Sequence, residues 1–114
     1  MQYMALIYSE EAGEASPELM QEYGTYTQDI IARGQFKAGD ALQSSSTATC
    51  VSVRDGKTSI KDGPFSETKE QLGGYYLLEC ANLDEAIEAA AKIPTAKTGT
   101  IEVRPVMMYN PGGN

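Results

Sequence analysis

The chain has 114 residues, 41% of them hydrophobic and 22% charged, which is an ordinary composition for one globular domain. Its net charge of −7 argues against nucleic acid or an anionic membrane as a partner, because neither would gain the charge neutralisation that drives such binding. The absence of histidine excludes a Ser-His-Asp triad, a Cys-His pair and a histidine-ligated metal or haem. Any acid–base chemistry therefore falls to Asp, Glu, Lys, Tyr or Cys.

The sequence carries no sign of export or of a bound metal. Residues 1–8 are too short and lack the basic flank of a signal peptide, and no apolar run approaches the roughly 20 residues of a membrane span. We therefore expect a cytoplasmic protein. Cys50 and Cys80 fit that compartment as small buried residues, with a disulfide as the less favoured alternative. Two cysteines cannot close a four-ligand zinc site, so we expect no metal and no cofactor.

The first third of the chain predicts a strand and a helix. Residues 3–8 are apolar on both alternating sets, which indicates a strand buried on both faces. Ser16 is a helix N-cap with Pro17 at the first helical position, and Gly34 is a stop signal, so we expect a helix over about 17–33 with Gly24 as its weak point. Its apolar face comprises Leu19, Tyr23, Tyr26 and Ile30.

The middle of the chain predicts a strand and a hairpin. Residues 36–43 form a strand pattern interrupted by Gly39. Asp55-Gly56 lies between alternating runs over residues 49–60, which is typical of a hairpin with a type I′ turn. Pairing outward from the turn sets Val53 opposite Thr58 and Val51 opposite Ile60, so that the apolar residues share one face.

The last third predicts a strand over residues 75–80, a helix and a final strand over residues 100–109. Asn82 and Glu85 have the spacing of a capping box, and Pro94 ends the helix near Lys92 or Ile93. The predicted buried stripe of that helix comprises Leu83, Ala86, Ile87 and Ala90. Pro105 predicts a bulge or an edge position in the final strand. We expect one domain over residues 1–110 and a frayed tail at 111–114.

This element order predicts an α+β fold, a ferredoxin-like split βαβ arrangement with an inserted β-hairpin. Two helices cover only one face of such a sheet, yet residues 3–8 and 75–78 are apolar on both faces. A second copy of the chain is the simplest cover for the other face. We therefore expect a homodimer with its sheets facing each other and a cavity between or beside them.

Several segments of the sequence resemble the DGPF proteins of the YCII-related superfamily. The resemblance rests on the continuous motif of residues 62–76, DGPFSETKEQLGGYY, and on the segments YMALIY (3–8), GDALQ (39–43) and GTIEVRPV (99–106). It covers nearly the whole chain, and the long gapless motif is specific. It implies a dimeric α/β-barrel type of assembly built from ferredoxin-like subunits.

The resemblance also implies small bacterial proteins, some of them encoded beside or fused to extracytoplasmic-function sigma factors, with no settled activity. Better-understood relatives have a His-Asp pair proposed as catalytic, a pair that this chain cannot form because it has no histidine. Asp40 stands where the DGPF pattern more usually has glutamate. Its shorter arm would move the carboxylate by about one methylene, which matters if that group positions a ligand.

Within the motif, Asp62 and Lys69 are the candidate catalytic residues. Asp62 precedes Gly63-Pro64 and has two interpretations: a general acid or base at a strand mouth, or an Asx-turn that fixes the backbone. Lys69 could place a cation beside an anionic or carbonyl-bearing substrate, or it could belong to a solvated loop with weak ion pairs. For Glu67, in the same segment, we favour the solvated loop.

The candidate ligand-binding residues are Arg104, Glu102, Tyr8 and Asp40. Glu102 and Arg104 lie two apart on a strand, so both point away from Ile101 and Val103. Arg104 could hold a ligand carboxylate in bidentate fashion, or the pair could form an interface salt-bridge network. The phenol of Tyr8 could donate to a substrate, although a core position is the commoner role for such a residue.

Three functions remain open from the sequence. The first is metal-free proton transfer or lyase-type chemistry on a small polar molecule, with Asp62 assisted by Lys69 and Arg104. The second is a non-enzymatic ligand-binding or regulatory protein, associated with sigma-factor signalling. The third is a purely structural dimer. Convergence of Asp62, Arg104 and a tyrosine hydroxyl on an enclosed pocket would favour the enzyme.

Overall fold

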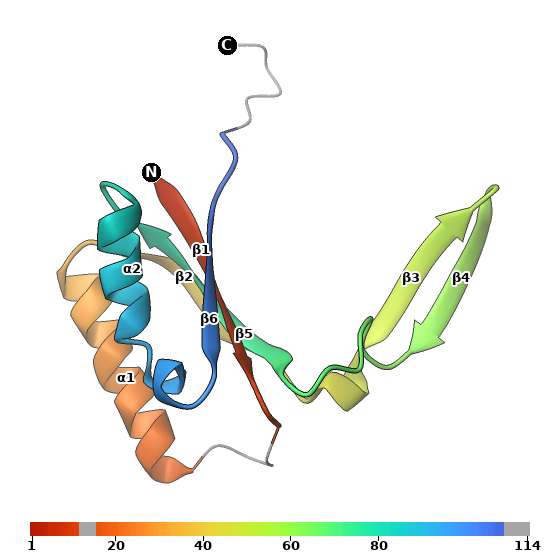
Figure 1. Ribbon diagram of the computed structural model, residues 1–114, viewed down its shortest axis with the longest axis horizontal. Coiled ribbons are helices and arrows are strands. Elements are labelled where there is room, and N and C mark those ends of the chain that lie inside the picture. The colour runs from red at the N-terminus through yellow and green to blue at the C-terminus, as the bar shows by residue number, and fades with distance from the viewer. Residues whose placement is uncertain (12–15, 109–114) are drawn as a thin grey trace.

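The computed structural model describes residues 1–11 and 16–108 and has a four-stranded sheet, two α-helices and a separate hairpin (Figure 1). The expected tail at 111–114 lies outside the described residues. In chain order the elements are β1 (Gln2–Ser9), α1 (Pro17–Ala32), β2 (Phe36–Ala41), η1 (Ser45–Thr47), β3 (Thr49–Arg54), β4 (Lys57–Asp62), β5 (Gln71–Glu79), α2 (Leu83–Ala91), η2 (Pro94–Lys97) and β6 (Thr100–Pro105).

The main sheet has the strand order β2-β5-β1-β6, and every neighbouring pair is antiparallel. Both helices lie on one face of this sheet, and the β3–β4 hairpin stands on the other side (Figure 1). The α+β content and the strand order agree with the predicted split βαβ arrangement. Pro105 lies on β6, which is an edge strand. Of the two positions predicted for this proline, a bulge or an edge, the structure confirms the edge.

The core lies between the sheet and the helices. In β1 and β5 alternate side chains point to the helices and are buried, and Tyr26 and Ile30 meet them from α1. The Tyr26 hydroxyl donates to the Ala89 carbonyl oxygen at 2.8 Å, and its ring packs edge-on against that of Tyr76. Burial raises the pKa of both phenols. The largest fully buried side chains are Ile30, Leu78 and Ile93.

Side-chain caps define where both helices begin, as predicted. The Ser16 hydroxyl accepts from the Leu19 N–H at 3.1 Å, and the Asn82 side chain accepts from the Glu85 N–H at 2.9 Å. The predicted stripe of α2 is only half right. Ala86 and Ala90 are buried, but Leu83 and Ile87 are about half exposed, because α2 packs through its small alanines and leaves its larger aliphatic residues outside.

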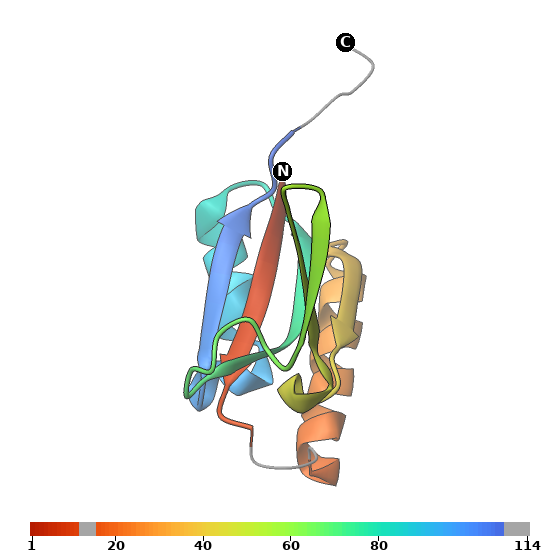
Figure 2. The ribbon, with the colours of Figure 1, turned by 90° about the vertical axis from the view of Figure 1, so that its right-hand side faces the viewer.

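The predicted hairpin is present with the predicted register. Val53 pairs with Thr58 and Val51 with Ile60. Asp55 and Gly56 both have positive φ, at 52° and 74°, as a type I′ turn requires. The hairpin nevertheless forms its own two-stranded sheet and does not join the main one. In Figure 2 it stands in front of the main sheet, facing the side without helices.

Three predicted strand boundaries were wrong. The second strand ends at Ala41 and the final strand at Pro105, both earlier than expected, whereas β5 begins at Gln71, four residues before its predicted start. The early start of β5 comes from pairing with the far end of β1. Ile7 pairs with Gly74 and Tyr8 with Leu72, so Gly73 is the extra residue of a β-bulge.

Candidate functional site

The uncovered face of the main sheet gathers four of the six predicted site residues. Strand register aligns Asp40, Tyr75, Leu6 and Glu102 in one row across β2, β5, β1 and β6. The next row contains Ala38, Leu77, Met4 and Arg104. Alternation along β1 puts Tyr8 on the same face as Leu6. We call this surface the open face; its centre is apolar and its two edges carry charge.

At the β6 edge of the open face, Tyr8 lies close to two charged side chains. Burial raises the pKa of the Tyr8 phenol, and the negative charge of Glu102 raises it further, while Arg104 acts in the opposite direction. The phenol therefore remains a hydrogen-bond donor at neutral pH. Arg104 and Glu102 are both exposed, and neither is in any ion pair found among residues 1–11 and 16–108. This group could bind a ligand through a donor, an acceptor and a cation.

At the opposite edge, Asp40 is held by a tyrosine. The Tyr75 hydroxyl donates to the Asp40 carboxylate at 2.7 Å, and this hydrogen bond raises the pKa of the phenol. Neighbouring strands lie about 4.8 Å apart, so three spacings separate Asp40 from Glu102 by roughly 14 Å. The two charged edges are therefore distinct groups within one chain, and a ligand of a few atoms contacts only one of them.

Asp62 lies away from the open face, at the base of the hairpin. It pairs with Thr49 at the end of β4 and is exposed. Across the described residues its carboxylate accepts no backbone hydrogen bond, so the Asx-turn interpretation finds no support. The turn is fixed instead by Gly63, whose φ is 103° and whose N–H donates to the Ala48 carbonyl at 2.7 Å.

Lys69 lies in the loop that leads into β5, and its ammonium is 3.1 Å from the Glu10 carboxylate. Both side chains are exposed, which makes this a weak surface pair. Glu67 is also exposed, whereas Glu70 is half-buried and accepts from the Thr100 hydroxyl at 3.1 Å. The structure thus does not bring Asp62 and Lys69 together with Arg104 inside one chain.

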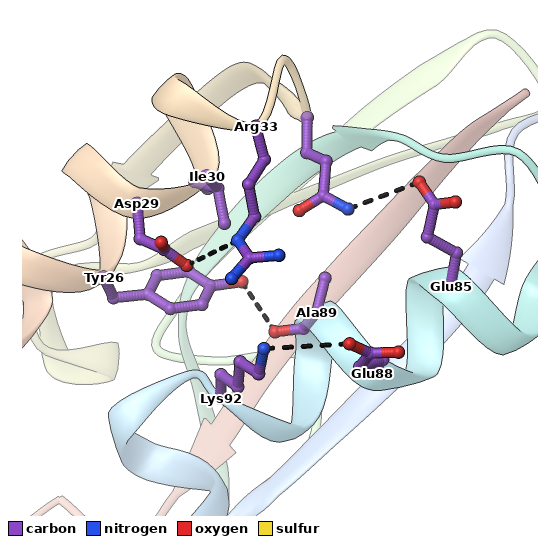
Figure 3. A pocket seen from close by; sticks show the side chains of 9 residues that line it. Tyr26, Asp29, Ile30, Arg33, Glu85, Glu88, Ala89 and Lys92 are labelled. Carbon is purple, nitrogen blue, oxygen red and sulfur yellow. Dashed lines mark hydrogen bonds and ion pairs between the residues drawn. The ribbon is translucent and has the colours of Figure 1, made fainter.

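A small hollow between the helices is closed to ligands (Figure 3). Its free space is about 10 Å³, at most that of one water molecule. Among the residues that line it, Arg33 pairs with Asp29 one helical turn earlier at 3.0 Å, and the Gln35 amide donates to Glu85 at 3.3 Å. None of the six predicted site residues lines it. A wider groove between α1 and the segment 91–97 is open and also contains none of them.

Sequence reasoning recognised that the second face of the sheet is apolar, but it named none of the central residues of the open face as part of the site. Met4, Leu6 and Leu77 stay partly exposed there because no element of the described chain covers them. The signal was present: β1 and β5 are apolar at both alternating sets of positions. Among the described residues no cluster of His, Cys, Asp and Glu could hold a metal ion, and no helix is long and apolar enough to cross a membrane.

Comparison with known proteins assigns the family. The sequence profile of the YCII-related domain matches residues 1–110. The chain belongs to the YCII-related family. An uncharacterized protein of Rhizobium meliloti (strain 1021) is 35% identical over 120 residues, which cover 98% of this chain and 97% of that relative. The resemblance seen in the sequence is thus confirmed at the level of the YCII-related family, and membership of its DGPF group remains a prediction.

Membership of the YCII-related family does not by itself assign a reaction. The relative matches this chain over nearly its whole length, but its name states no activity. The role of this YCII-related chain therefore has to be argued from the open face. That face carries charged and phenolic side chains, and no element of the described chain covers it.

Proposed function

We propose that the protein is a homodimer that binds a small polar organic molecule over the open face, with metal-free acid–base activity on that molecule. One observation carries the proposal: an apolar centre of Met4, Leu6 and Leu77 lies uncovered between two charged edges. A second subunit turned toward this face would cover the apolar centre and enclose the edges. Enclosure strengthens the electrostatic contacts that a small ligand needs.

Arg104 is the anchor in this proposal. Its guanidinium presents paired N–H donors that match a carboxylate, and it has no ion-pair partner within the described part of the chain. Glu102 is the adjacent carboxylate, and the protonated Tyr8 phenol supplies a neutral donor. The ligand class that this group fits is a small carboxylate or carbonyl compound.

A non-enzymatic ligand-binding or regulatory role, such as one in sigma-factor signalling, is the second candidate. It is favoured by the exposure of Asp62 and Lys69, the two residues first considered catalytic. Water around an exposed carboxylate or ammonium weakens its action on a substrate. Within one subunit the geometry thus supports binding more strongly than catalysis.

A thermal-shift series with small carboxylates, such as pyruvate and malate, tests the site. We expect at least one compound to raise the melting temperature of the parent and to lose that effect in Arg104→Met. Lys57→Met removes an exposed cation from the hairpin and is the matched control that should keep the shift. A compound that stabilises Arg104→Met as much as the parent would show that it binds elsewhere. If the parent converts the bound compound, Asp62→Asn separates catalysis from binding. A variant that still shows the rise in melting temperature but no longer converts the compound would favour the enzyme.

A further inference from the structure

The β3–β4 hairpin has two chemically different faces. Its register places Val51, Val53 and Ile60 on one side, and Asp62 and Thr49 pair at the end of that same side. We call this side the apolar hairpin face. The opposite side carries all three cations of the hairpin, Arg54, Lys57 and Lys61.

The apolar hairpin face has no cover within its own chain. Val51, Val53 and Ile60 are 63%, 57% and 67% exposed, and Phe65, which follows the hairpin, is 93% exposed. An isolated two-stranded hairpin is at best marginally stable in water. Three exposed β-branched side chains on one face indicate that a protein surface covers this face.

We propose that this cover is a second copy of the chain, and that the hairpin is an exchanged arm that completes the partner's site. The apolar hairpin face of one subunit packs on the open face of the other. Asp62 lies on that hairpin face, so its carboxylate is delivered to Arg104 of the partner subunit. This inference rests on the homodimer proposed above. It explains why Asp62 and Arg104 are both exposed and separate within one chain.

Charge distribution favours another copy as the occupant. The hairpin, residues 49–62, contains three basic and two acidic residues, a net charge of +1. The rest of the chain contains six basic and fourteen acidic residues, a net charge of −8. A hairpin of net charge +1 that crosses to a partner body of net charge −8 offsets part of the repulsion between two chains of −7.

The exposed area is also sufficient for such an exchange. A compact monomer of 12.3 kDa exposes about 6,100 Å², whereas this chain exposes 8235 Å². The surplus of about 2,100 Å² exceeds the roughly 800 Å² that each partner buries in an interface of standard size. The hairpin is one source of that surplus, because every one of its residues except Cys50 is exposed.

The composite site would hold two carboxylates and one guanidinium. Asp62 from one subunit would lie near Glu102 and Arg104 of the partner subunit, beside the protonated Tyr8 phenol. A carboxylate is a proton acceptor in general base catalysis, and here two of them would flank the ligand site. Such a pair suits proton transfer on a small carboxylate or carbonyl compound anchored by the arginine.

Cross-linking distinguishes exchange from closure within one chain. In a Cys50→Ser background, Asp62→Cys and Arg104→Cys are combined in one chain and treated with a short bis-maleimide at low protein concentration. The remaining native thiol, Cys80, is 2% exposed. We expect a covalent dimer at twice 12.3 kDa on a denaturing gel. The control pairs Ser59→Cys, on the cationic side, with Arg104→Cys and should remain monomeric on the gel.

Each other outcome contradicts a stated part of the proposal. An internally linked chain at the monomer mass would mean that the hairpin folds onto its own sheet. A native dimer that gives no covalent dimer, or a Ser59 control that links equally well, would overturn the exchanged arm and leave the homodimer intact. A parent protein that is monomeric by native mass spectrometry would overturn both the arm and the homodimer.

Discussion

Among single residues, the tyrosines show how the two faces of the sheet differ. The buried hydroxyls of Tyr26 and Tyr76 meet neutral partners, the Ala89 carbonyl at 2.8 Å and the Thr27 hydroxyl at 2.7 Å. On the open face, Tyr75 meets the carboxylate of Asp40, and Tyr8 lies beside Glu102. The buried phenols contribute to packing, whereas those of the open face lie where a ligand or a second subunit could reach them.

Replacing Tyr26 by Phe should change the alkaline stability of the protein. Burial raises the pKa of the Tyr26 phenol above its value in the unfolded chain, about 10. The folded state therefore holds this proton more tightly, and its stabilising effect is complete below pH 10 and is lost as the pH rises further. We expect Tyr26→Phe to cost about 1–2 kcal/mol at pH 7 through the lost hydrogen bond, and to have a shallower decline in stability above pH 10.

Urea unfolding at pH 7 and at several values above pH 10 measures both effects. Tyr75→Phe is the control, because its phenol is on the open face and its removal should alter the alkaline decline much less. Equal declines for the parent and Tyr26→Phe would mean that this phenol does not titrate with unfolding.

Individual site residues were predicted unequally well. Glu102 and Arg104 were placed together correctly because alternation along one strand is a local rule. The proximity of Tyr8 to them depends on β1 pairing with β6, which lies about 90 residues further along the chain. The separation of Asp62 from Arg104 could not be predicted, since nothing in the sequence says that the hairpin stays out of the main sheet.

Among the elements, local chemistry was a better guide than burial patterns. The caps at Ser16 and Asn82 and the Asp55-Gly56 turn are set by hydrogen bonds or backbone angles within a few residues, and all three are confirmed. The start of β5 and the exposed side of α2 depend on which distant element packs against them. Both were among the predictions that the structure corrected.

Substituting Gly24 by Ala should strengthen α1. Gly24 is in the interior of the helix and is exposed, and a Cβ built there meets no atom within 4 Å. Alanine is about 0.8–1.0 kcal/mol more favourable than glycine in a helix interior. We expect Gly24→Ala to raise the free energy of unfolding by up to about 1 kcal/mol, visible as a rise of a few degrees in thermal unfolding.

Gly34 provides the matched control for this helix. A Cβ there is equally free of contacts, but its φ of 73° lies in the left-handed region. Gly34→Ala should therefore lower the stability by about 1–2 kcal/mol. A loss of stability in Gly24→Ala as well would mean that a surface packs against this side of α1.

At the scale of the whole molecule, coverage of the sheet is one-sided. Helices cover one face, and the hairpin stands away from the other (Figure 1; Figure 2). The Cα radius of gyration is 16.3 Å, against about 13 Å for a compact chain of this length. The partly exposed centre of the open face and the exposed apolar hairpin face are therefore the two surfaces that assembly would bury.

Introducing a charge at the centre of the open face tests that assembly directly. Leu6 lies between Tyr75 and Glu102 in the same row and points away from the helices, so Leu6→Lys leaves the helix-side core untouched. In a facing dimer the new ammonium would be desolvated at the interface, and pairing with the adjacent Glu102 would not offset that penalty in full, so we expect the dimer to be weakened by several kcal/mol. We expect light scattering after size exclusion to give twice 12.3 kDa for the parent and 12.3 kDa for Leu6→Lys.

The control for this experiment is Met20→Lys, which places the same charge on α1 at a methionine that is 65% exposed. It should keep the parent mass, and far-UV circular dichroism should show both variants folded. The monomeric variant should also lose amide protection in β3 and β4 before β1 and β5, because a lone hairpin is only marginally stable. A dimer that tolerates Leu6→Lys but dissociates in Met20→Lys would place the interface on the helices.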